Sequence, residues 1–129
     1  MGRTFLDHVD LRVESFERSL PLYDALFLAL GMGRIWRSER WVGYGYAEVE
    51  VPFFAITEEA EHRGNHNRIA FAAETKETVD RVGQAIRAAG GQEIEGPEFC
   101  PEYHAGYYAV FFEDGDGNRF EVCCHSAQG

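Results

Sequence analysis

The sequence contains no apolar run that approaches the roughly 20 residues of a membrane span, and its start, MGRTFLDHVD, lacks the apolar stretch of a signal peptide. Its three cysteines include the adjacent Cys123 and Cys124 and form no CxxC pair, which argues against a disulfide framework or a structural zinc site. Basic residues are scarce: 12 Lys and Arg stand against 22 Asp and Glu, a net charge of −10 that repels nucleic acid and anionic lipid. These absences predict a cytoplasmic protein with free thiols and no nucleic-acid or membrane partner.

The composition is that of one well-packed unit. The 129 residues are 45% hydrophobic and 14% aromatic, which is enough for one core and too short for two ordinary domains. We therefore expect a single domain over residues 1–129.

The chain repeats itself at an offset of 60 residues. HVDLRVESFERSLPLYDALFLALGM, from His8, aligns without a gap on RIAFAAETKETVDRVGQAIRAAGGQ, from Arg68. The matched pairs include Glu14 and Glu74, Ser15 and Thr75, Leu26 and Ile86, and Gly31 and Gly91. The repeat predicts two copies of one structural module, at residues 5–60 and 66–126.

Each copy has the same local pattern. An alternating strand leads to Ser15 or Thr75, which are suited to cap the following amphipathic helix, and Gly31 and Gly90 or Gly91 are suited to end it. Three extended segments follow each helix, and EDGDGN between the last two is a hairpin turn in which Asp and Gly are expected to supply positive φ angles. The sequence thus predicts two tandem βαβββ modules and an α+β fold with eight strands.

This pattern resembles the vicinal oxygen chelate superfamily, which includes glyoxalase I, extradiol dioxygenases, and the bleomycin and fosfomycin resistance proteins. The resemblance covers nearly the whole chain and is closest at the end, in YHAGYYAVFFEDGDGNRFEVCCH. It implies a curved, mixed-sheet cup with the helices outside, and a divalent metal at its base (Fe, Mn, Ni or Zn) that chelates a small-molecule substrate. It also implies a lyase, isomerase or dioxygenase activity and a homodimer.

The metal ligands that the resemblance implies are incomplete. His8 and Glu121 match two of the three positions, but the middle position is Arg68, which has no lone pair to offer a metal. His66 is the alternative ligand, displaced by about 6.6 Å at roughly 3.3 Å per strand residue. Arg68 is otherwise expected to pair with Glu121 across the cup or to present its guanidinium to a substrate carboxylate.

Three further site predictions concern polar groups near the end of the chain. Glu121 is the candidate for proton transfer, and His104, on a loop entering a strand, is a candidate for substrate contact. Tyr107 and Tyr108 alternate, so one of them should face the cup, and we predict that it is Tyr107.

Three functions remain open at this point. The first, favoured by family frequency, is a metal-assisted enzyme. The second is a metal-free, bleomycin-resistance-like protein that sequesters a cationic aromatic compound in an acidic groove. We expect that groove to be lined by Trp36, Trp41, Phe53 and Phe54. The third is a regulatory module that retains the fold, with Arg68 and Glu121 as a structural ion pair.

Overall fold

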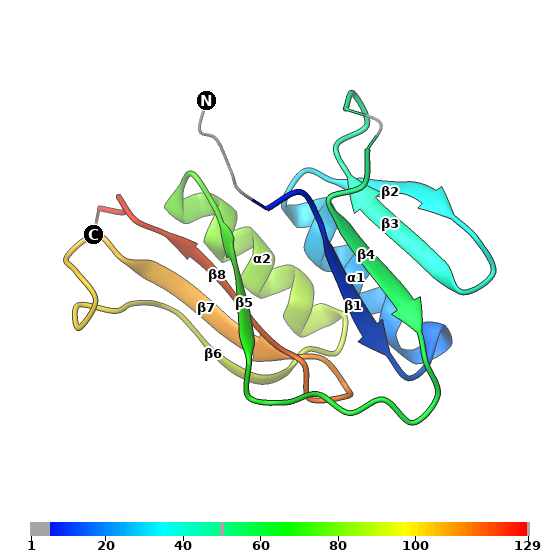
Figure 1. The fold of residues 1–129 in the computed structure, drawn as a ribbon. Coiled ribbons are helices and arrows are strands. Elements are labelled where there is room, and N and C mark those ends of the chain that lie inside the picture. Colours follow the sequence, from blue (N-terminus) through cyan, green and yellow to red (C-terminus); the bar gives the residue numbers. More distant parts are fainter. Residues whose placement is uncertain (1–5, 50, 129) are drawn as a thin grey trace.

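Eight strands and two helices form two βαβββ modules in the computed structural model, which describes residues 6–49 and 51–128 (Figure 1). The first module contains β1 (Val9–Val13), α1 (Phe16–Ala29), β2 (Gly33–Arg37), β3 (Trp41–Gly45) and β4 (Phe54–Glu58). The second contains β5 (Arg68–Ala72), α2 (Lys76–Ala88), β6 (Gln92–Phe99), β7 (Tyr108–Glu113) and β8 (Arg119–Cys124). The predicted α+β class is confirmed. Residues 1–5, 50 and 129 of the predicted domain lie outside the described residues.

The eight strands form two separate four-stranded sheets of the same topology. Their orders are β1-β4-β3-β2 and β5-β8-β7-β6, with the first pair in each order parallel and the other pairs antiparallel. Figure 1 shows both helices on the same side of the two sheets, where α1 and α2 also contact each other. Each sheet therefore has one face covered by a helix and one open face. No helix in the described part of the chain is long and apolar enough to cross a membrane.

Both helices begin at the residues that the sequence predicts. The Ser15 hydroxyl accepts a hydrogen bond from the backbone N–H of Arg18, and the Thr75 hydroxyl accepts one from Thr78. Gly31 (φ 88°) and Gly90 (φ 94°) follow the helix ends in the left-handed region, which identifies Gly90 rather than Gly91 as the second terminator.

Aromatic rings from both modules meet in one core. Phe27 contacts Phe54 and Phe71, with ring centroids 5.2 and 5.6 Å apart, and Phe71 stacks on Phe120 at 6.2 Å. Phe54 is fully buried, so it does not line the aromatic groove predicted from the sequence. Phe53 is half-buried and packs on Phe54 and Phe71.

The turn between β7 and β8 fastens the second module to the first. Asp114 is buried in this turn and accepts hydrogen bonds from the Tyr23 hydroxyl of α1 (2.5 Å) and from the Asn118 side chain (2.8 Å). The same Asn118 amide donates to the Arg12 carbonyl of β1 (3.1 Å). Within the turn the positive φ belongs to Gly117, whereas the sequence had suggested that Asp would share this role; Asp114 serves as an acceptor.

We expect Tyr23→Phe to lower the free energy of unfolding by about 1.5 to 3 kcal/mol, because it removes a buried hydrogen bond to a carboxylate. The measurement is denaturant unfolding followed by circular dichroism. Tyr46→Phe is the matched control, since Tyr46 is 45% exposed and should change stability by less than about 0.5 kcal/mol. Equal losses in the two variants would contradict a fastening role for the turn.

Candidate functional site on the open face of the second sheet

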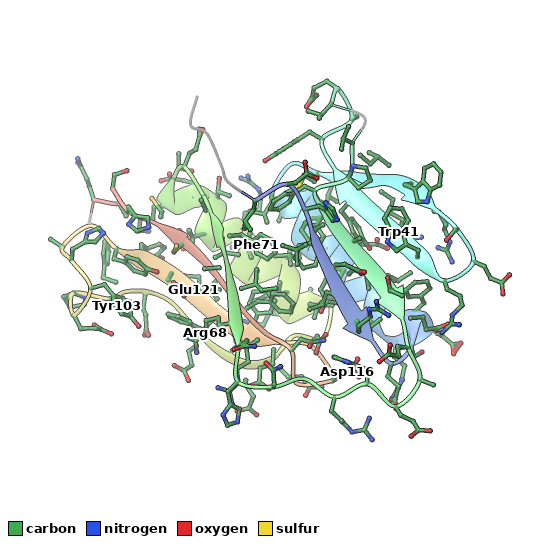
Figure 2. The ribbon with its side chains drawn as sticks, viewed as in Figure 1. Trp41, Arg68, Phe71, Tyr103, Asp116 and Glu121 are labelled. Carbon is green, nitrogen blue, oxygen red and sulfur yellow. The ribbon has the colours of Figure 1, made fainter. Side chains whose placement is uncertain are left out.

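Strand alternation places the polar side chains of the second sheet on its open face. The register pairs Arg68 with Arg119, Ala70 with Glu121, and Phe111 with Glu121. Register partners point to the same side of a sheet. The intervening residues, such as Phe71, point into the core on the helix side. Figure 2 shows Arg68 and Glu121 on this sheet.

Glu121 is a buried carboxylate held by one phenol. Its side chain is 6% exposed and its Oε2 accepts a hydrogen bond from the Tyr107 hydroxyl. Burial, followed by the contacts with Cys123 and Glu121, raises the pKa of Tyr107, so its hydroxyl keeps its proton at neutral pH. A donor at this place offsets part of the cost of burying a carboxylate. The structure thus places Tyr107 on the open face, while the Tyr108 hydroxyl donates to Asp80 of α2 on the helix side.

His104 is exposed and belongs to a pair of histidines beside this carboxylate. Its Nε2 lies 3.0 Å from Nδ1 of His125, and the two rings stack with centroids 5.2 Å apart. The edge of the Tyr107 ring contacts both imidazoles. Sequence analysis missed His125, although the alternation of 121, 123 and 125 along the last strand carries the signal. Cys123, 3.9 Å from His125 Nε2, has its pKa raised by burial, which disfavours a thiolate nucleophile.

Arg68 contacts an aromatic ring instead of the predicted carboxylate. Its guanidinium carbon lies 4.9 Å from the centre of the Phe111 ring. Among the ion pairs of the described residues, none joins Arg68 to Glu121. The predicted ion pair is therefore not formed, because Arg68 is level with Arg119 and Glu121 lies two residues further along β8.

The predicted metal ligands do not assemble within one chain. His8 is exposed and its Nδ1 lies 2.8 Å from Asp7 Oδ1, and His66 is exposed just before β5. β1 and β5 run in opposite directions in Figure 1, so residues that precede them belong to opposite ends of the sheets. Over residues 6–49 and 51–128, no group of three His, Cys, Asp or Glu side chains is placed to hold a metal ion. With a permanent cation, Arg68, at the middle position, these residues do not fit a divalent metal.

The open face of the first sheet carries a pair of tryptophans beside the charged residues Asp10 and Arg12 of β1. Trp36 and Trp41 pack edge to face with ring centroids 5.8 Å apart. Gly43 is required here, because a Cβ would lie 2.8 Å from Pro52 Cβ and 3.1 Å from Trp41 Cη2. A hollow of about 270 Å³ beside them is lined by Asp7, His8, Trp41, Val51, Pro52 and Ala55.

A family model extends over most of the chain. The model of the Glyoxalase/Bleomycin resistance protein/Dioxygenase superfamily matches residues 5–122. The comparison with curated protein sequences finds no significant match.

Several solved structures share the fold. A glyoxalase/bleomycin resistance protein from Albidiferax ferrireducens is 27% identical, with a TM-score of 0.76, and the match covers 98% of this chain and 100% of that one. A putative glyoxalase from Bacillus halodurans is 25% identical, with a TM-score of 0.72 and 96% of each chain covered. The fosfomycin resistance protein FosX from Listeria monocytogenes, complexed with Mn(II) and sulfate, is 22% identical, with a TM-score of 0.67 and coverage of 98% and 93%. The last similarity concerns the fold alone.

We expect Arg68→Ala to change the free energy of unfolding by less than about 1 kcal/mol, because an exposed cation on an aromatic ring contributes no more than that. Tyr107→Phe, which leaves the buried Glu121 without this donor, should cost about 1.5 to 3 kcal/mol. Denaturant unfolding of the two variants beside the natural protein gives both values. A larger loss for Arg68→Ala than for Tyr107→Phe would show that Arg68, and not Tyr107, compensates the charge of Glu121.

Proposed function

Because this chain belongs to the Glyoxalase/Bleomycin resistance protein/Dioxygenase superfamily, we propose that it is a small-molecule enzyme in which Glu121 transfers a proton on the open face of the second sheet. The observation that carries the proposal is the buried Glu121 carboxylate, which accepts a hydrogen bond from the Tyr107 hydroxyl on the face of the sheet that points away from α2. A buried carboxylate on an open face is costly for stability, which is typical of a functional group.

Each neighbouring side chain has a role in this proposal. Because the Tyr107 hydroxyl donates its hydrogen bond to Oε2 of Glu121, Oε1 is the oxygen that accepts the substrate proton in this proposal. Arg68 supplies a fixed positive charge near Glu121 for an anionic substrate or for the negative charge that develops when the proton leaves. His104, stacked on His125 at the rim of the same face, contacts the far end of the substrate.

We propose that this site works without a divalent metal. The fosfomycin resistance protein FosX from Listeria monocytogenes, which has a similar fold, is complexed with Mn(II). In this chain the three predicted ligand positions do not meet and one of them is a guanidinium. The charge that a metal would provide is, in our proposal, provided by Arg68.

The aromatic open face of the first sheet favours a second candidate function, sequestration of a cationic aromatic compound. The Trp36 and Trp41 pair offers the π faces, and the net charge of −10 would attract a cation. This candidate requires binding without turnover and makes no use of Glu121.

Proton exchange in D₂O tests the proposed function. Small carboxylates that carry a C–H next to a carbonyl are incubated with the protein in D₂O, and loss of that C–H signal is followed by proton NMR. We expect exchange that Glu121→Gln slows at least about 100-fold, because a positioned base contributes on the order of 10² to 10⁴, and that EDTA leaves unchanged.

The same experiment contains its contradicting outcomes. Exchange that EDTA abolishes and Mn(II) restores would show a metal enzyme. A cationic aromatic dye that quenches the tryptophan fluorescence, with no exchange in the whole panel, would favour the sequestering function. Tyr107→Phe should slow exchange less than Glu121→Gln, since it removes the aligning group and keeps the base.

We also propose that the chain forms a homodimer through the open faces. Several large apolar side chains beside the first sheet are exposed: Trp36 (56%), Tyr46 (45%), Val49 (57%) and Val51 (56%). A second copy that covers them would also enclose a ligand on the open face of the second sheet, which one chain leaves open to water.

Sedimentation equilibrium at tens of micromolar should give twice the 14.6 kDa mass of the chain. Trp36→Ser should shift the equilibrium toward monomer, because it removes apolar area from the interface. Leu28→Ser is the matched control: Leu28 is 75% exposed but lies on α1, away from the open faces, and its substitution should leave the dimer intact. A monomeric natural protein at this concentration would overturn the proposal.

A further inference from the structure

Two arginines stand side by side at the start of the second sheet. Arg68, the first residue of β5, is the register partner of Arg119, the first residue of β8, and partners on paired strands are about 4.8 Å apart with side chains on the same face. A guanidinium is a cation with five N–H donors and no acceptor. Like charges directly opposite each other destabilise a sheet, so this arrangement favours an anion between them.

Neither guanidinium has its donors satisfied. The Arg119 Nε atom is buried and has no hydrogen-bond partner among residues 6–49 and 51–128; Glu113 Oε2, the carboxylate oxygen of its ion pair, is 3.6 Å away, too far for a hydrogen bond. Arg68 makes no hydrogen bond or ion pair with the described residues, and its contact is the Phe111 ring. A buried donor without a partner is rare in folded proteins and indicates a ligand or a water at that place.

The two side chains line a cavity of about 210 Å³. This equals the volume of about seven waters, at roughly 30 Å³ each, which suits a ligand of small-metabolite size. The charged residues of its wall are Arg68, Arg119, Glu93, Glu95 and Glu113, and Phe111 is one of its aromatic residues. Glu93 adopts a positive φ of 50° at an irregularity in β6, a conformation that is unfavourable for a residue with a Cβ and that clusters at functional sites.

The charges of the wall restrict the ligand. Glu113 is engaged with Arg119, while Glu93 and Glu95 make no hydrogen bond or ion pair with the described residues. The two arginines and three glutamates give the wall a net charge of −1. This wall would repel a phosphate dianion more strongly than a carboxylate, which has a single negative charge. A carboxylate that also carries an ammonium group complements both sides, because the carboxylate meets the arginines and the ammonium meets the free glutamates.

Building on the proposed function, we propose that Arg68 and Arg119 together bind the carboxylate of a small zwitterionic amino acid, whose ammonium group lies against Glu93 and Glu95. Glu121 is two residues beyond Arg119 on the same face of β8. The proposed ligand and the proton-transfer residue therefore share one face of the second sheet, although Glu121 does not line the cavity itself.

Ligand titrations followed by NMR of the arginine side-chain N–H groups test the inference. The probes are L-alanine, β-alanine and 4-aminobutyrate, with propionate, propylamine and inorganic phosphate as comparisons. We expect saturable shifts of the Arg68 and Arg119 signals with at least one amino acid, at least tenfold tighter than with propionate, propylamine or phosphate. Arg68→Gln and Arg119→Gln should each weaken that binding at least tenfold. Glu95→Gln should reduce the ratio of the affinity for the amino acid to the affinity for propionate.

Controls separate this inference from the proposed function. Arg63 pairs with Glu14 and does not line the cavity, so Arg63→Gln should leave amino-acid binding unchanged. Glu121→Gln should still bind the amino acid, because Glu121 does not contact its carboxylate or ammonium group in this proposal. If the natural protein binds the amino acid but catalyses no proton exchange, the proposed function is overturned and the inference stands. Phosphate or propionate that binds as tightly as the amino acids, or no saturation by any amino acid at 50 mM in a folded protein, would overturn the inference.

Discussion

The buried carboxylate of Asp114 is the interaction on which the arrangement of both modules depends. It holds the Tyr23 hydroxyl of the first module and the Asn118 amide of its own turn. The same turn reaches the linker between the modules, where the Asp116 carbonyl accepts from the backbone N–H of Gly64 (2.8 Å). At Gly64 a Cβ would lie 2.3 Å from the Gly117 carbonyl carbon, so only glycine allows this close approach. Since Arg119 follows the turn directly and Arg68 follows the linker four residues after Gly64, one set of contacts fixes the relative position of the two arginines.

Much of the fold could be read from the sequence because its signals are local. The caps at Ser15 and Thr75 and the 60-residue repeat depend on neighbours in the chain, and the structure agrees with them. The pairing register is not local, and it explains what sequence analysis missed. An ion pair between Arg68 and Glu121 looked plausible until the register placed Arg68 level with Arg119. Phe54 looked available for a groove, but its pairing with Val9 and Tyr44 turns it into the core. The contact of Asn118 with Arg12 joins residues 106 positions apart, which no local pattern reveals.

The two modules share one backbone topology but carry different residue types on their open faces. In the first sheet Asp10 pairs with Ala55, and in the second Ala70 pairs with Glu121. Because Asp10 and Ala70 are equivalent under the 60-residue offset, Ala55 is the counterpart of Glu121. The carboxylate of the first module therefore lies on the outer strand, where Asp10 accepts from Thr57. That of the second module lies on the inner strand and is buried. The open face of the first sheet thus combines the tryptophan pair with the ion pair of Asp10 and Arg12, whereas that of the second holds the buried Glu121.

The sequence has Arg68 at the position where the family resemblance predicts a metal ligand, and a guanidinium offers different chemistry from a divalent ion. A divalent ion binds a substrate oxygen as a Lewis acid and lowers the pKa of a bound water. A guanidinium does neither, but it offers a planar set of N–H donors that matches a carboxylate and keeps its charge at every working pH. The Phe111 ring, whose centre lies 4.9 Å from the guanidinium carbon, contacts Arg68 without neutralising its charge, whereas a carboxylate partner would neutralise it. In the site that we propose, the absence of an ion pair between Arg68 and Glu121 leaves the guanidinium available for a ligand and Oε1 of the carboxylate available for a proton.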